Sequence, residues 1–132
     1  MNNSKLNVKA ILICDNVATD GQSGKNTLYG IFDNINAKQF PAIHRSLCVF
    51  VNFTEALGQY RFRLELVNVE NNNPVFPGAE ILDVVCPDIE LHYSLVFQIN
   101  ELKFDVPGKY EFRLFANGQI CETSTIRIKQ IP

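Results

Sequence analysis

The stretch Tyr60-Arg61-Phe62-Arg63-Leu64-Glu65-Leu66 decides the fold class. Large apolar side chains alternate in it with charged ones. Successive side chains of an extended strand point to opposite faces, so this alternation puts the apolar set in a core and the charged set in water. The stretch from Leu91 to Ile99 repeats the pattern. Both therefore predict strands that are buried on one face only, which is typical of an antiparallel sheet.

Short alternating segments of this kind recur along the chain between clusters of turn-forming residues, and none shows a helical apolar period over about ten residues. We predict eight strands, over residues 6–17, 27–36, 45–54, 60–69, 80–87, 91–99, 109–116 and 119–129. In a chain of 132 residues, strands at this spacing indicate one domain over residues 1–132. The predicted fold is an all-β, antiparallel β-sandwich.

Two local features refine this prediction. Asn117-Gly118 stands between the last two predicted strands and favours a tight hairpin whose turn residues have positive φ. Tyr110 begins the penultimate predicted strand, where the tyrosine of immunoglobulin-like sandwiches donates a hydrogen bond to upstream backbone. The sandwich is therefore expected to be Ig-like. The chain has no tryptophan, and Phe112 replaces the second cysteine of antibody-type domains.

Charge narrows the classes of partner. The net charge is −2, and no lysine or arginine occurs from Leu64 to Leu102, although acidic residues continue through that stretch. Domains that bind nucleic acid carry a basic face, so we expect no nucleic-acid partner. We interpret the acidic stretch as a solvent-exposed side of the sandwich.

The apolar runs are short. None approaches the roughly 18 residues of a membrane helix, and Ala10–Cys14 is shorter than the roughly 7–15 residues of a signal-peptide core. We therefore expect no membrane partner and a cytoplasmic location. Cys14, Cys48, Cys86 and Cys121 form no C-x-x-C pair. In a reducing compartment they are expected to be free, buried thiols.

The motifs that resemble chemical sites fail on spacing. Gly21-Gln22-Ser23-Gly24-Lys25 lacks the four residues that separate the glycines of a phosphate loop, and a strand follows it instead of a helix. His44 and His92 have no partner at metal-ligand spacing. We accordingly predict no catalytic residue, no cofactor and no metal ligand, and we expect the protein not to be an enzyme.

The segment Pro74-Val75-Phe76-Pro77 is the most unusual surface feature. Two prolines stiffen an extended segment and lower the entropy cost of presenting Val75 and Phe76 to a partner. Glu80 and Asp83 follow closely and would supply an acidic rim, which should prefer a basic partner surface. The candidate protein contact is therefore Val75, Phe76, Glu80 and Asp83. In the alternative interpretation, Phe76 folds back and caps the core.

These features predict a non-enzymatic protein-binding or structural assembly module, acting on a protein partner or on further copies of itself. The alternative is a ligand-binding sandwich for carbohydrate or calcium. A protein-binding module should have a flat apolar patch or a pairing edge. A ligand-binding sandwich should have a concave surface with exposed aromatic side chains or clustered carboxylates.

Several short motifs also resemble a known family. They are Ala10-Ile11-Leu12-Ile13-Cys14-Asp15, Ser23-Gly24-Lys25, Gly30-Ile31-Phe32-Asp33, Phe40-Pro41 and Pro107-Gly108-Lys109-Tyr110-Glu111-Phe112. Together they are similar to a family of short bacterial proteins that form an uncharacterised domain of unknown function. The resemblance covers nearly the whole chain and implies a β-sandwich. It implies no activity and no site residues.

Overall fold

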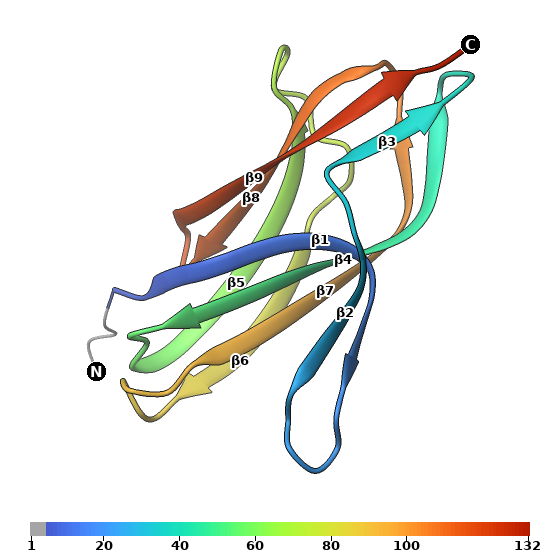
Figure 1. Ribbon diagram of the computed structural model, residues 1–132. Helices are drawn as coiled ribbons and strands as arrows, with labels where there is room; N and C mark the ends of the chain where they lie inside the picture. The colour runs from blue at the N-terminus through green and yellow to red at the C-terminus, as the bar shows by residue number, and fades with distance from the viewer. Residues whose placement is uncertain (1–4) are drawn as a thin grey trace.

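The computed structural model describes residues 5–132, so the first four residues of the predicted domain lie outside the described part. Over residues 5–132 the chain forms nine strands and no helix that could cross a membrane (Figure 1). The strands are β1 (Asn7–Thr19), β2 (Asn26–Ile31), β3 (Asn34–Ala37), β4 (Ala42–Thr54), β5 (Gly58–Asn68), β6 (Ala79–Cys86), β7 (Tyr93–Phe104), β8 (Gly108–Ala116) and β9 (Gln119–Gln130).

The strands form two sheets that pack face to face (Figure 1). One sheet has four strands in the order β2-β1-β4-β7, and the other has five in the order β3-β9-β8-β5-β6. All named pairings are antiparallel except that of β3 with β9. The prediction of an all-β, Ig-like antiparallel sandwich is confirmed.

The core lies between the sheets and is built by the alternation that the sequence shows. On β5, the predicted inward residues Tyr60, Phe62, Leu64 and Leu66 are all buried. The ring of Phe62 meets that of Phe53, on β4 of the opposite sheet, with centroids 5.1 Å apart. Aromatic contacts of this kind add to the stabilisation that comes from burying apolar area, and here they join the two sheets.

The predicted strand over residues 27–36 is wrong in one respect, because it is two strands in different sheets. The chain can bend at Gly30, whose φ of 65° glycine adopts without strain. Other residues do not fit there, because a Cβ would overlap the carboxylate of Asp15. The Phe32 amide then donates to Ile13 of the first sheet, while Asp33 accepts from Arg127 of the second. The chain therefore changes sheets between Phe32 and Asp33.

The two local predictions are confirmed. The Tyr110 hydroxyl donates to the carbonyl of Val106 at 2.7 Å, and its side chain is buried. Asn117 and Gly118 have φ values of 51° and 83°, which are the positive angles of a type I′ hairpin between β8 and β9. Both features fix the course of β8, which lies at the centre of the five-stranded sheet.

Candidate functional site

The predicted contact residues Val75 and Phe76 lie on the connection from β5 to β6. Both are partly buried and pack against the core. The amide of Val75 donates to the carbonyl of Leu66 at 2.8 Å, so this segment continues the pairing along β5 ahead of the first residue of β6. Much of the apolar area of Val75 and Phe76 is thus used inside the protein, which agrees with the alternative in which Phe76 caps the core.

The other two predicted contact residues, Glu80 and Asp83, are exposed on β6, which is an edge strand. The side-chain amide nitrogen of Gln59 donates to the Asp83 carboxylate at 3.0 Å. Asp83 has a φ of 57° and lies where the pairing of β6 with β5 shifts register, which defines a β-bulge. The bulge turns this part of the edge strand away from regular pairing.

Arg63 of β5 ties these parts together through three contacts of its guanidinium. Nε lies 3.1 Å from Glu65, Nη1 lies 3.4 Å from Glu80, and Nη2 donates to the carbonyl of Pro77 at 2.8 Å. Gly78 lies directly beneath the guanidinium, since a Cβ there would be 2.5 Å from Nη2, and its φ is 102°. Arg63 therefore clamps the Pro74–Gly78 segment onto the sheet and occupies both neighbouring carboxylates.

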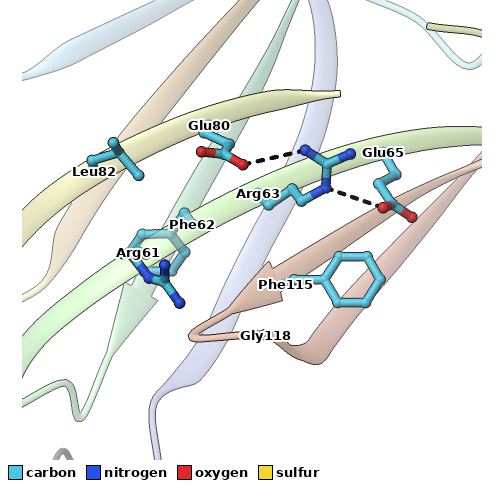
Figure 2. A pocket seen from close by; sticks show the side chains of 8 residues that line it. All are labelled: Arg61, Phe62, Arg63, Glu65, Glu80, Leu82, Phe115 and Gly118. Atoms are coloured by element: carbon cyan, nitrogen blue, oxygen red, sulfur yellow. Dashed lines mark hydrogen bonds and ion pairs between the residues drawn. The ribbon is translucent and has the colours of Figure 1, made fainter. Parts of the chain in front are cut away.

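Beside this clamp, the outer face of the five-stranded sheet has a hollow of about 290 Å³ (Figure 2). Side chains from β5, β6 and β8 line it together with the turn before β9. They are Arg61, Phe62, Arg63, Glu65, Glu80, Leu82, Phe115 and Gly118. Figure 2 shows Leu82 and Phe115 on opposite sides of Arg61. Leu82 is 55% exposed, so the hollow offers apolar surface next to charge.

Arg61 is the second cation of the hollow, and its surroundings differ from those of Arg63. Its backbone is fixed by a reciprocal pair of hydrogen bonds with Asn117, each 2.8 Å long. Across residues 5–132, no carboxylate lies within ion-pair distance of its guanidinium, whereas Arg63 engages both Glu65 and Glu80. The sequence interpretation treated Arg61 only as an exposed charge. A strand order that places Phe115 beside β5 would have been needed to find the hollow.

The remaining reactive groups do not join this hollow. In the described part of the chain, no three histidine, cysteine or acidic side chains gather in a way that could hold a metal ion. The four cysteines are free. Burial raises the pKa of the Cys14, Cys48 and Cys86 thiols, and it raises the pKa of Cys121 to about 11 with a smaller contribution from Glu122. These thiols are therefore protonated at pH 7.

Residues 9–129 match a family described as a family of unknown function, DUF6941. The chain belongs to this family. The match confirms the resemblance found in the sequence, and it brings no activity or site residue to the hollow. No curated protein matches the chain.

Solved structures share the fold at low identity. The DNA glycosylase AlkC of Pseudomonas fluorescens, bound to DNA with an abasic-site analogue, is 6% identical with a TM-score of 0.56 over 94% of this chain and 30% of its own. A β-glucosidase of Listeria innocua in complex with isofagomine is 11% identical, with a TM-score of 0.50 over 97% and 17%. An immunoglobulin-like protein of Pseudomonas aeruginosa is 9% identical, with a TM-score of 0.41 over 95% and 97%.

These likenesses concern the fold alone. The chain spans less than a third of the length of the glycosylase and of the glucosidase that it matches. Sandwich domains support many unrelated functions, so function has to be argued from the site.

Proposed function

We propose that this protein is a non-enzymatic protein-binding module that docks an acidic, extended segment of a partner protein in the hollow beside β6. The observation that carries the proposal is Arg61, whose guanidinium meets no carboxylate of residues 5–132 and which Figure 2 shows between the apolar side chains of Leu82 and Phe115. A carboxylate from outside would complete the charge pairing that the fold leaves open at this point.

The chemistry of the hollow suits a short peptide segment. Protein interfaces combine an apolar centre with a polar rim, and aromatic residues and arginine are enriched in them. A guanidinium can bind a carboxylate through two parallel hydrogen bonds, which fixes both position and orientation. Leu82 and Phe115 can take up an apolar side chain next to that carboxylate. A volume of about 290 Å³ has room for one or two side chains of a partner.

The proposed partner segment is acidic, whereas the sequence led us to expect a basic partner surface. Glu80 is paired with Arg63, and Asp83 accepts from Gln59, so neither carboxylate presents an unopposed charge. Arg61 remains and favours an acidic group. The bulge at Asp83 also argues for docking through side chains, because it interrupts the regular edge that an added strand would need.

The test is an NMR titration of the 15N-labelled chain with two capped peptides, Thr-Leu-Asp-Leu-Thr and Thr-Leu-Lys-Leu-Thr. We expect the acidic peptide to shift the amide resonances of Arg61, Leu82 and Phe115 in a saturable way, and the basic peptide to leave them unchanged. Added salt should weaken the acidic peptide, because exposed charges are screened.

A pair of matched variants completes the experiment. Arg61→Gln should abolish the shifts, whereas Arg127→Gln, which removes an exposed arginine of β9, should leave them as in the wild type. Equal binding of both peptides, shifts that avoid the hollow, or unchanged binding by Arg61→Gln would each overturn the proposal.

A further inference from the structure

The outer face of the four-stranded sheet has an unusual composition. The register of β1, β4 and β7 places Ile13, Val49 and Phe97 in one row, and all three belong to the core. The row beside it therefore points away from the core. Leu12, Phe50 and Val96 form that outward row, so apolar side chains stand on both faces of this sheet.

Exposed lysines, Lys9 of β1 and Lys103 of β7, lie at the two ends of this face. Between them, no charged side chain occurs among the outward positions, four on each strand. They are Ala10, Leu12, Cys14 and Asn16 on β1, Ser46, Cys48, Phe50 and Asn52 on β4, and Ser94, Val96, Gln98 and Asn100 on β7. We call this set the uncharged face. A surface that only contacts water has no physical reason to avoid lysine and glutamate, which are among the residues most often exposed.

The centre of the uncharged face is apolar and its surroundings are polar. Leu12 and Val96 are each 37% exposed and flank Phe50, which is 9% exposed although it is outside the core cluster. Ile31 of β2 pairs with Cys14 and extends the apolar area with a side chain that is 59% exposed. At the other end, the amide of Asn52 donates to the Ser94 hydroxyl at 3.0 Å.

We infer that a second copy of this chain covers the uncharged face in a two-fold symmetric dimer. A two-fold contact sets the same patch against itself, so any excess of one charge on it would repel its own copy. The uncharged face carries no such charge. Its asparagine, glutamine and serine side chains both donate and accept hydrogen bonds, so each type can pair with its own kind. A partner selected by charge would leave a different composition on this face.

The size of the face sets the strength of the dimer. Standard interfaces use about 20–30 residues on each side. The uncharged face and Ile31 together supply fewer residues than that. We therefore expect a reversible dimer that forms at micromolar to millimolar concentration. Because no ions are desolvated or paired, added salt should not weaken it. This distinguishes the dimer from the salt-sensitive docking proposed at Arg61.

The test is sedimentation equilibrium of the full chain over a concentration series. The wild type should shift from 15.0 kDa toward twice that mass as its concentration rises. Val96→Lys should remain monomeric at every concentration, because the symmetric contact would bury two like charges. The control Val85→Lys makes the same change at a position of β6 in the other sheet that is 63% exposed, and it should dimerise as the wild type does.

A milder variant covers the case in which Val96→Lys does not fold. Val96→Thr keeps the branched shape and the β-propensity, and it should raise the dimer dissociation constant by about tenfold, as expected for loss of a central apolar contact. A wild type that stays monomeric up to millimolar concentration would overturn the inference. So would full dimerisation of Val96→Thr and of folded Val96→Lys, or a dimer that dissociates when salt is added.

Discussion

The two outer faces of the sandwich are built on the same alternating pattern and yet differ in almost every property. The face of the five-stranded sheet carries Arg61, Arg63, Glu65 and Glu80, with ion pairs and a hollow. The uncharged face of the four-stranded sheet has amides, hydroxyls and an apolar centre. The side chains that face inward from both sheets form the core and account for the fold. The side chains that face outward are not constrained by the core, so the difference between the two outer faces bears on function.

The largest expected effect tests the clamp on the charged face. Gly78→Ala should lower the free energy of unfolding by about 2 kcal/mol, because a residue other than glycine is strained at positive φ and the new Cβ would displace the Arg63 guanidinium. Urea denaturation measures this loss. Gly21→Ala is the matched control, since its Cβ would meet open space. Similar midpoints for the two variants would show that Arg63 does not depend on Gly78.

A second variant tests the hydrogen bond that holds the turn before β8. Tyr110→Phe removes the hydrogen bond to Val106 and should cost about 1–2 kcal/mol, because a bond is lost and a part-buried carbonyl loses its partner. Its edge-on contact with Phe104 should persist. Thermal unfolding measures the cost. An unchanged melting temperature would mean that the tyrosine corner contributes nothing here. Dimerisation and peptide binding should both remain, because the hydroxyl belongs to neither outer face.

A third variant separates stability from binding on the charged face. Arg61→Met should change the free energy of unfolding by less than about 0.5 kcal/mol, since an exposed arginine without an ion pair contributes little. The same variant should lose the acidic peptide. Parallel urea and titration experiments check both points. A large loss of stability would mean that the Arg61 side chain stabilises the fold, and it would contradict the proposal that this side chain is available to bind a ligand.

The smallest effect concerns the thiols. Because the pKa of Cys121 is raised to about 11, the folded protein holds this proton more tightly than the unfolded chain does. Its contribution to stability is therefore complete below pH 9 and is lost as the pH rises toward 11. Alkylation by iodoacetamide should be slow at pH 7 and accelerate with pH. Cys14 and Cys48, on the uncharged face, should react still more slowly at concentrations where the dimer forms.

Thiol counting supplies the control for that experiment. All four cysteines are free, so denaturation without a reductant should expose four reactive thiols. A lower count would reveal a disulfide in the native protein and would contradict the free-thiol assignment.

The sequence predicts the inward half of this molecule well. The alternation at Tyr60–Leu66 identifies buried residues correctly, and Tyr110 and Asn117-Gly118 identify their local structures. These signals are short-range, because the side-chain period and the turn angles depend only on neighbouring residues. The strand split at Gly30 was missed because residues 27–36 read as one continuous strand, although the chain changes sheets there.

The outward half depends on which strands become neighbours. The predicted contact residues Glu80 and Asp83 lie on an edge strand, but the sequence did not show that Arg61, Leu82 and Phe115 line one hollow. Phe115 approaches β5 only because β8 pairs with β5, and this pairing is separated along the chain by two other strands. The uncharged face likewise joins residues from three distant segments. Its lack of charge becomes visible only when the register is known.

The most direct test of the contrast between the faces is a series of 1H–15N correlation spectra of the wild-type chain, with no ligand, from micromolar to millimolar protein concentration. Rising concentration should shift the resonances of Leu12, Phe50 and Val96 and leave those of Arg61 and Leu82 in place. Shifts confined to Arg61 and Leu82, or an unchanged spectrum at every concentration, would contradict this contrast.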